Sequence, residues 1–280
     1  MKILMDGMFE CYRSDWTFKT FQTTTGKQTG VIYGVISSWL RYKKQFQVNP
    51  IMVWDGKPIH RSALNVDYKS TRERQRPEFY SQIKEVKEIL PYLGAYQFYH
   101  SEWEADDTLA SLAEKFSKKE EVVIVTCDKD LWQVVKDNPF PISVFNPIKK
   151  EFNNPITVKA KYCIEPNQLP LLWAIIGQAG DDIPGVPRFP SKVATSLIQK
   201  YGTLEDIFLN LDKEELSPNK KKSLKDNTEQ VINSYGLAKI NCELDKLMMT
   251  EGKLDIEKLK EIFNANEFNS FLNKIEQFYD

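Results

Sequence analysis

Three short, unbroken apolar runs, each followed by an aspartate, constrain the fold of this chain more than any other feature of its sequence. The runs and their aspartates are residues 2–5 with Asp6, residues 51–54 with Asp55, and residues 122–126 with Asp128. Helical patterns separate them, most clearly over residues 30–45, 78–90 and 105–116. Continuous apolar strands that alternate with helices are typical of a parallel sheet covered on both faces. We therefore predict an α/β fold built around such a sheet.

The carboxyl ends of parallel strands meet at one edge of a sheet, where such folds bind their ligands. The three aspartates are therefore expected on one rim. Glu104, Asp106 and Asp107 crowd the start of the helix predicted over residues 105–116 and belong beside it. A single aspartate after a strand is more often a helix cap or a turn residue. Capping does not explain several carboxylates on one rim, because independent caps have no reason to converge.

Carboxylates this close repel one another unless a cation or a helix N-terminus offsets their charge. Ligands that are all oxygen suit Mg²⁺ or Mn²⁺. Two such ions about 4 Å apart can activate water and stabilise the leaving oxygen in phosphodiester hydrolysis. The chain has only two histidines, His60 and His100, which weighs against zinc hydrolases and Ser-His-Asp catalysis. The rim therefore predicts a site for hard divalent cations.

Composition limits the class of protein and its compartment. The chain has 280 residues, of which 41% are hydrophobic and 28% charged, as is ordinary for a globular protein. Its apolar runs are too short to span a membrane, and the N-terminal one is too short for a signal peptide. The four cysteines are scattered and form no CxxC pair, so no zinc knuckle or disulfide framework is indicated. We expect a cytoplasmic protein.

The pattern changes after about residue 155. Strands and helices alternate before this point, whereas residues 166–280 are mostly helical in pattern, for example over residues 167–177 and 191–201. We divide the chain into an α/β core, residues 1–165, and a helical region, residues 166–280. Residues 220–222, three consecutive lysines, are expected in a solvated loop or at a helix end.

Two further segments each have an ordinary explanation and a functional one. Residues 57–76 carry six basic side chains against two acidic ones, although the net charge of the chain is only −1. This segment is either solvated or an arch that grips phosphates, with Tyr68 able to stack on a base. Residues 177–187 are either a turn-rich linker or a loop that presents N–H groups to a DNA phosphate, helped by Lys192. The residues alone leave both choices open.

Other phosphate-handling families fit less well. A haloacid-dehalogenase-type phosphatase needs Asp-x-Asp after its first strand, but residue 8 is Met. No Walker A or dinucleotide-binding glycine pattern is present.

Taken in order, the segments resemble the 5′-nuclease superfamily: flap endonucleases, the 5′–3′ exonuclease domain of bacterial DNA polymerase I and stand-alone bacteriophage or bacterial nucleases. The match covers roughly the first 200 residues most clearly. The matching pieces are Met5-Asp6-Gly7 with Tyr12-Arg13, Gly30-Val31-Ile32-Tyr33-Gly34, Trp54-Asp55-Gly56, Tyr68-Lys69-Ser70-Thr71-Arg72, Glu104-Ala105-Asp106-Asp107, Thr126-Cys127-Asp128-Lys129-Asp130-Leu131 and Asp181-Asp182-Ile183-Pro184-Gly185-Val186. The resemblance implies a PIN-like nuclease core with helices on both faces, followed by a helical DNA-binding region with a helix-three-turn-helix.

The resemblance also implies roles for individual residues. The first metal would be held by Asp6, Asp55, Glu104 and Asp106, with Asp107 binding directly or through water. The second would be held by Asp128, Asp130 and Asp181. Lys69 and Arg72 would lie in a basic arch near residues 60–90 and act on the scissile phosphate. The implied DNA contacts are Arg13, Tyr68, Lys69, Arg72, Arg188 and Lys192.

Two departures from the family pattern change these expectations. Gln178 stands where the family has an aspartate, so the second of the two Mg²⁺ or Mn²⁺ ions is expected to bind more weakly. Arg188-Phe189-Pro190 replaces a glycine-containing turn that often holds K⁺. Losing both glycines restricts close backbone approach and argues against K⁺ there.

The resemblance therefore predicts a divalent-metal-dependent 5′–3′ exonuclease and flap endonuclease that hydrolyses DNA near 5′ ends and flap–duplex junctions. Its expected partners are DNA with 5′ flaps, nicks or free 5′ ends, with RNA–DNA hybrid as a further substrate class, and no membrane. We expect a monomer acting in replication or repair, in the host cytoplasm if it is phage-encoded. One alternative is a weakly active or non-catalytic relative that binds DNA junctions. The other is a ribonuclease of the PIN type, although its members are shorter and lack the arch.

Overall fold

A seven-stranded sheet forms the centre of the molecule in the computed structural model, which describes residues 1–66, 68–70 and 73–278. The strand order is β6-β5-β4-β1-β2-β3-β7. The five inner strands are parallel, and the edge strands β6 and β7 are antiparallel. The strands are β1 (Lys2–Asp6), β2 (Ile51–Trp54), β3 (Gln97–Tyr99), β4 (Val122–Val125), β5 (Ile142–Asn146), β6 (Glu151–Asn153) and β7 (Met248–Thr250).

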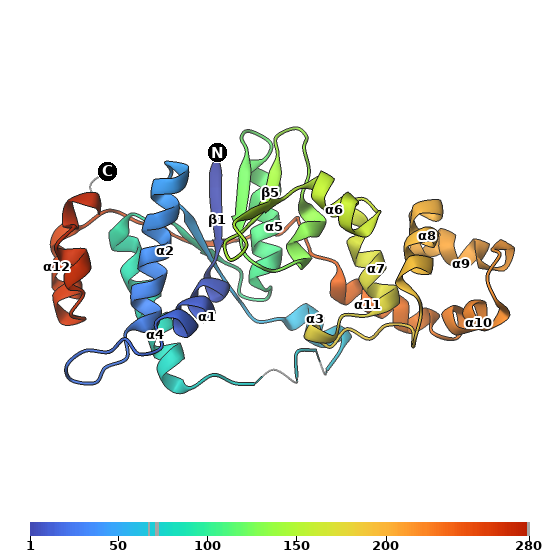
Figure 1. Ribbon diagram of the computed structural model, residues 1–280, viewed down its shortest axis with the longest axis horizontal. Helices are drawn as coiled ribbons and strands as arrows, with labels where there is room; N and C mark the ends of the chain where they lie inside the picture. The colour runs from blue at the N-terminus through green and yellow to red at the C-terminus, as the bar shows by residue number, and fades with distance from the viewer. Residues whose placement is uncertain (67, 71–72, 279–280) are drawn as a thin grey trace.

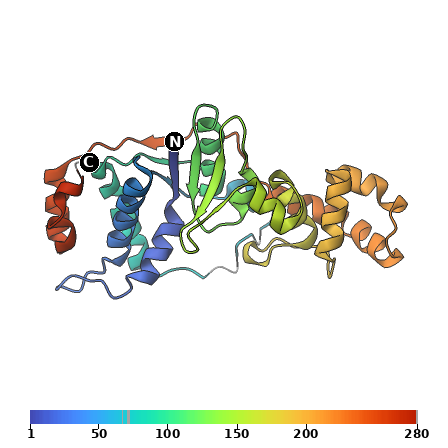
Figure 2. The same ribbon diagram turned by 45° about the horizontal axis from the view of Figure 1, so that its top comes forward.

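Hydrophobic clusters cover both faces of the sheet, because alternate residues of a strand point to opposite sides. In β1, Leu4 packs in one cluster, whereas Ile3 and Met5 pack in the other. Helices α1 (Gly7–Thr17), α2 (Gly30–Phe46), α4 (Pro77–Ile89) and α12 (Ile256–Ala265) cover the face of Ile3. Helix α5 (Ala105–Phe116) covers the face of Leu4 (Figures 1 and 2). The predicted α/β core with helices on both faces is confirmed.

The helical region extends from one end of the sheet and gives the molecule its elongated outline (Figure 1). Helix α7 packs against α11, and α8 against α9. The elements of this region are α6 (Pro155–Tyr162), α7 (Leu169–Ile176), α8 (Ser191–Tyr201), α9 (Leu204–Asn210), α10 (Pro218–Asp226) and α11 (Thr228–Ala238). Within the described residues, no helix is both long enough and apolar enough to cross a membrane.

After α11 the chain returns to the sheet. Strand β7 pairs with the edge strand β3, and α12 and α13 (Asn269–Leu272) pack on the face that α2 and α4 cover. Figure 2 shows this return as a long connection that ends at α12, on the far side of the sheet from α8 and α9. The last part of the chain therefore packs with the α/β core, and the division at residue 165 stays a prediction.

Several elements differ from the sequence prediction for local reasons. Helix α1 has no clear signal in the sequence, because its start coincides with the end of a strand: Asp6 both ends β1 and caps the helix. The edge strands β6 and β7 are only three residues long and too exposed to give an apolar pattern. Residues 220–222 lie in the first turns of α10, which agrees with a helix end and not with a loop, because Pro218 begins that helix earlier.

Gly56, directly after Asp55, allows two loops to approach each other closely. A Cβ atom on this residue would lie 1.7 Å from the carbonyl oxygen of His100 and 2.7 Å from that of Trp103. We expect Gly56→Ala to lower the free energy of unfolding by about 2–3 kcal/mol, measured by urea denaturation. Gly180→Ala is the matched control, since a Cβ there would meet no described atom within 4 Å, and it should stay within about 0.5 kcal/mol. Equal losses in both variants would contradict this packing.

Candidate active site

A cleft of about 240 Å³ opens at the carboxyl ends of β1, β2 and β4. The parallel register places the end of β1 beside both neighbouring strands. Five acidic residues line the cleft together with Lys69, Thr126 and Tyr12: Asp6, Asp55, Glu104, Asp106 and Asp128. Four of the five come from the strand ends and helix start that the sequence singles out, and Asp128 follows β4 by three residues. The structure therefore brings these predicted residues to one point.

Backbone N–H groups hold two of these carboxylates in place. Asp6 Oδ1 accepts a hydrogen bond from Phe9 N at 2.9 Å, and its Oδ2 accepts one from Thr126 Oγ1 at 3.0 Å. Asp55 Oδ1 accepts from Ala105 N at 2.7 Å, at the start of α5. Asp6 therefore caps α1, and Asp55 accepts a hydrogen bond from the first residue of α5. Each side chain thus satisfies a helix N-terminus and also lines the cleft.

The cleft holds more negative charge than its surroundings balance. Burial raises the pKa of Asp6 to about 7, and repulsion from Asp55 and Asp128 adds to the effect. Burial also raises the pKa of Asp55. The pKa of Asp106 is raised well above its ordinary value by burial and then by Asp128. Raised carboxyl pKa values mean that the site favours added positive charge, whether protons or a cation.

Two residues of the basic segment contact Glu104, and of these Lys69 lines the cleft. Lys69 Nζ lies 2.7 Å from Glu104 Oε1 and 3.8 Å from Asp181 Oδ1. The hydroxyl of Tyr68 donates to Glu104 Oε2 at 3.1 Å. Burial raises the pKa of Glu104, but Lys69 and Arg61 outweigh it, so the net shift is downward. Arg72, predicted to act with Lys69, lies outside the described residues.

A second acidic group adjoins the first and contains the departure at Gln178. Its side-chain Nε2 donates to Asp130 Oδ1 at 2.8 Å and to Asp181 Oδ2 at 2.9 Å. Its Oε1 is buried and has no hydrogen-bond partner among the described residues. Burial, with Asp128 and Asp181, raises the pKa of Asp130 to about 7, although the amide opposes this. An amide thus bridges two of the three carboxylates that the resemblance assigns to the second metal.

Asp107 departs from its predicted role. It is fully buried and does not line the cleft. Arg61 Nη1 and Nη2 donate to its two oxygens at 2.6 and 2.9 Å, and Asn241 N donates to Oδ1 at 2.9 Å. Successive residues of a helix point about 100° apart, so Asp106 and Asp107 do not face the same side. Its position therefore does not support the predicted contact with the first metal, either direct or through water.

The predicted DNA contacts lie at varied distances from the cleft. Arg13 turns toward α2, where its Nη2 donates to Ser38 Oγ at 2.7 Å and lies 3.3 Å from Glu10 Oε2. Arg188 and Lys192 are exposed at the start of α8. Phe189, between the two positions at which the resemblance implies glycine, is 8% exposed and packs in the core. The role of each of these residues in DNA binding stays a prediction.

Arg61 is the functional candidate that the sequence did not reveal. It was counted with the basic segment as a solvated or phosphate-binding charge, yet it is only 5% exposed. Its guanidinium contacts both Glu104 and Asp107. A linear sequence gives no sign of this, because the acidic partners lie more than forty residues away.

The donor set fits a divalent cation, although the ligand geometry is not already formed. Among the described residues, no three acidic, histidine or cysteine side chains stand close enough to hold a metal ion. The ammonium of Lys69 and the amide of Gln178 lie among the carboxylates. The fit comes from the chemistry: the carboxylates supply only hard oxygen donors, they line one cleft, and their like charges are not fully offset.

The fold and this cleft define a class, the metal-dependent nucleases with a parallel-sheet core. Family models then cover nearly the whole chain. "5'-3' exonuclease, N-terminal resolvase-like domain" matches residues 1–163, and "5'-3' exonuclease, C-terminal SAM fold" matches residues 164–262. The chain belongs to the 5′–3′ exonuclease family, which confirms the resemblance found in the sequence.

Individual relatives agree with this assignment over their full lengths. The chain is 31% identical to a 5′–3′ exonuclease of Buchnera aphidicola subsp. Schizaphis graminum, covering 96% of each protein. It is also 31% identical to a 5′–3′ exonuclease of Aquifex aeolicus, covering 99% of this chain and 95% of the relative. Among solved structures it is similar to a bacteriophage T5 flap endonuclease in complex with DNA and metal ions, with a TM-score of 0.70 and 19% identity over 86% of this chain and 89% of the other.

The raised carboxyl pKa values predict how stability depends on pH. Asp6 and Asp130 have pKa values of about 7, above the ordinary 3.8. A carboxyl whose pKa is higher in the folded state stabilises the fold when protonated, and this contribution is lost as pH rises through the folded-state value. With a chelator present, we expect Tm to fall by about 2–5 °C between about pH 5.5 and 8. Asp6→Asn should show a smaller fall, measured by scanning calorimetry.

Added Mg²⁺ should oppose the fall in Tm that we expect at high pH. A cation that binds only the folded protein stabilises it, and protons compete with it for the same oxygens. We therefore expect about 10 mM Mg²⁺ to raise Tm at pH 8 and to change it little at pH 5.5. Insensitivity to Mg²⁺ at pH 8 would show that the cleft is not a cation site.

Proposed function

We propose that this protein is a divalent-metal-dependent 5′–3′ exonuclease and flap endonuclease that hydrolyses DNA phosphodiesters near 5′ ends and at flap–duplex junctions. The observation that carries the proposal is the cleft of clustered carboxylates at the strand ends, with Lys69 of the basic segment inside it. Membership of the 5′–3′ exonuclease family supports the same reaction. We expect a cytoplasmic monomer, in keeping with its four unpaired cysteines.

Mg²⁺ or Mn²⁺ is the proposed cofactor. Asp6, Asp55, Glu104 and Asp106 would hold the first ion, and Asp128, Asp130 and Asp181 the second. Bound divalent ions supply a Lewis acid that activates water and offsets charge on the phosphate. The protein supplies fixed oxygens, whose orientation is set before the substrate arrives by bonds such as that from Ala105 N to Asp55.

Lys69 is proposed to stabilise the negative charge that develops on the scissile phosphate. Burial lowers its pKa, but Glu104 and Asp106 raise it more, so the net shift is upward. The side chain therefore stays a charged ammonium and serves as an electrostatic group, not as a base. Arg72 is proposed to assist from the same segment.

DNA recognition is proposed to depend on backbone contacts and junction shape, with little sequence preference. Arg13, Arg188 and Lys192 would contact phosphates, and Tyr68 would stack on an unpaired base. The T5 flap endonuclease with the similar fold was solved with DNA, which supports this substrate class. RNA–DNA hybrid is a further proposed substrate.

Cleavage of a labelled 5′ flap tests the main proposal. We expect short 5′ products when Mg²⁺ or Mn²⁺ is added and none in a chelator. Asp106→Asn should lower the rate by more than about 100-fold, because losing a ligand exceeds the 10–100-fold cost of losing a supporting group. DNA binding should remain. The control is Asp137→Asn, an exposed aspartate away from the cleft. Equal activity of both variants would remove Asp106 from the site.

One observation favours a second candidate function, a relative that binds DNA junctions and cleaves weakly or not at all. Gln178 donates to Asp130 and Asp181, so an amide occupies the position between two proposed ligands of the second ion. Tight junction binding without cleavage at any Mg²⁺ or Mn²⁺ concentration would favour this function over the first.

The variant Gln178→Asp tests how tightly the second ion binds. The change removes the bridging amide and adds a carboxylate, so we expect the Mn²⁺ concentration for half-maximal cleavage to fall by about tenfold. Gln178→Asn is the control, since it shortens the side chain but adds no charge. A titration curve unchanged in Gln178→Asp would contradict the place assigned to Gln178.

A further inference from the structure

Arg61 joins three separate segments of the chain behind the carboxylate cleft. It comes from helix α3 (Ile59–Leu64), at the start of the basic segment. Its Nη1 donates to Glu104 Oε2 at 2.8 Å and to Asp107 Oδ2 at 2.6 Å. Its Nε donates to the carbonyl of Leu237 at 3.1 Å, near the end of α11. Carbonyls at a helix C-terminus lack partners within the helix and accept cationic donors well.

We propose that Arg61 is a positioning residue that fixes the orientation of Glu104 for the metal ion. The inference rests on the proposed function, in which Glu104 is a ligand of the first ion. Arg61 and Tyr68 hold Oε2 of Glu104 from behind, whereas Oε1 is directed to Lys69 in the cleft. Holding one carboxylate oxygen fixes where the other points, and such supporting contacts set metal affinity.

Asp107 acts in this arrangement as the anchor of Arg61. Asp107 accepts a bidentate contact from the guanidinium: Nη2 donates to Oδ1 at 2.9 Å, and Nη1 donates to Oδ2. Asn241 N donates to the same Oδ1, which fixes Asp107 in turn. A planar fork that meets a carboxylate through two bonds has one orientation. The position of Glu104 thus depends on contacts from α5 and from the chain after α11.

The charge of Arg61 can be tested separately from its geometry, because a lysine at this position keeps the positive charge but not the shape of the guanidinium. A lysine ammonium is a point charge without the rigid fork of arginine. It does not contact Glu104, Asp107 and the carbonyl of Leu237 in the same arrangement. Arg61→Lys therefore reports on positioning, with little change in local charge.

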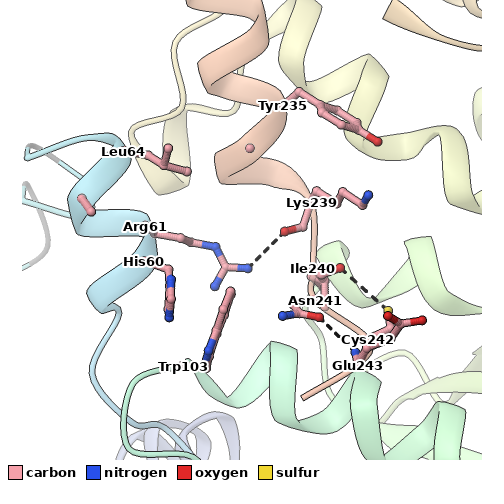
Figure 3. Close-up of a pocket in the computed structure, with 12 residues that line it drawn as sticks. His60, Arg61, Leu64, Trp103, Tyr235, Lys239, Ile240, Asn241, Cys242 and Glu243 are labelled. Carbon is pink, nitrogen blue, oxygen red and sulfur yellow. Dashed lines mark hydrogen bonds between the residues drawn. The ribbon is translucent and has the colours of Figure 1, made fainter. Parts of the chain in front are cut away.

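A cavity of about 730 Å³ lies on the other side of Arg61. Figure 3 shows Arg61 at its wall, next to the stacked rings of His60 and Trp103 and directed toward the carbonyl of Lys239. Leu64, which also lines the cavity, is 49% exposed, so the cavity reaches the surface. A small cation from solvent therefore has a path to the place of the guanidinium once the Arg61 side chain is shortened.

The first experiment measures Mn²⁺ affinity by the electron paramagnetic resonance signal of the free ion, which needs no catalysis. Arg61→Lys should weaken Mn²⁺ binding to the complete chain by about 10–100-fold while circular dichroism shows an intact fold. Lys136→Met is the matched control, since it removes an ion pair to Glu114 near the other end of α5. The control should bind Mn²⁺ as the wild type does. Unchanged or tighter binding in Arg61→Lys would overturn the proposal.

The second experiment restores the missing group through the cavity. Arg61→Ala should lose Mn²⁺ affinity, and millimolar guanidinium should recover at least about tenfold of it, because the ion can occupy the vacated place. Urea has a similar shape but no charge, and at matched ionic strength it should recover none. Equal effects of urea and guanidinium would count against a specific contact. If neither Arg61 variant folds, Arg61 is a structural residue and the proposal fails.

Glu104→Gln separates failure of this proposal from failure of the proposed function. If Glu104→Gln binds Mn²⁺ as tightly as the wild type, Glu104 is not a ligand and the proposed metal site is wrong. If Glu104→Gln loses Mn²⁺ affinity and Arg61→Lys does not, the site is right and only the role of Arg61 is overturned.

Discussion

Repulsion among clustered carboxylates is the constraint on which the site depends. Asp6, Asp55, Asp106 and Asp128 line one small cleft, where each charged group disfavours the ionisation of its neighbours. Such an arrangement persists only if the rest of the fold holds the side chains in place. The sheet does so by packing on both faces, so that the register of β1 with its neighbours does not slip.

The groups that offset this charge come from distant parts of the chain. Lys69 reaches Glu104 from the basic segment, Gln178 reaches Asp130 from the loop after α7, and Arg61 links α5 to the end of α11. The contacts of Gln178 and Arg61 join the α/β core to the helical region, whereas the contact of Lys69 lies within residues 1–165. The charge of the site therefore ties the two regions of the molecule together, in addition to the hydrophobic core that α5 shares with α7 and α11.

Local signals explain what the sequence could predict. The apolar runs predict three of the inner strands, β1, β2 and β4, and the amphipathic pattern predicts helices such as α5 and α8. The place of Asp6 and Asp55 follows from the rule that strand ends share a rim. The direction in which a side chain points has no such local signal, and neither has a contact between residues far apart in the sequence. Asp106 and Asp107 are neighbouring aspartates that the sequence does not distinguish. Because successive residues of a helix point about 100° apart, Asp106 lines the cleft and Asp107 contacts Arg61. Arg61 looked solvated because its partners are remote, and β7 is an edge strand of three residues.

Because of Gln178, the first and the second acidic group of the site differ in how far the protein itself offsets their negative charge. A carboxylate at this position would add a negative charge and only accept hydrogen bonds, whereas the amide is neutral and donates to Asp130 and Asp181. The second acidic group is thus partly satisfied by the protein itself. In the first group Lys69 donates to Glu104, but within the described residues no amide bridges Asp6 and Asp106, whose pKa values burial raises. The demand for an external cation is therefore concentrated at the first group, and the proposed dependence of catalysis on metal should follow that group most closely.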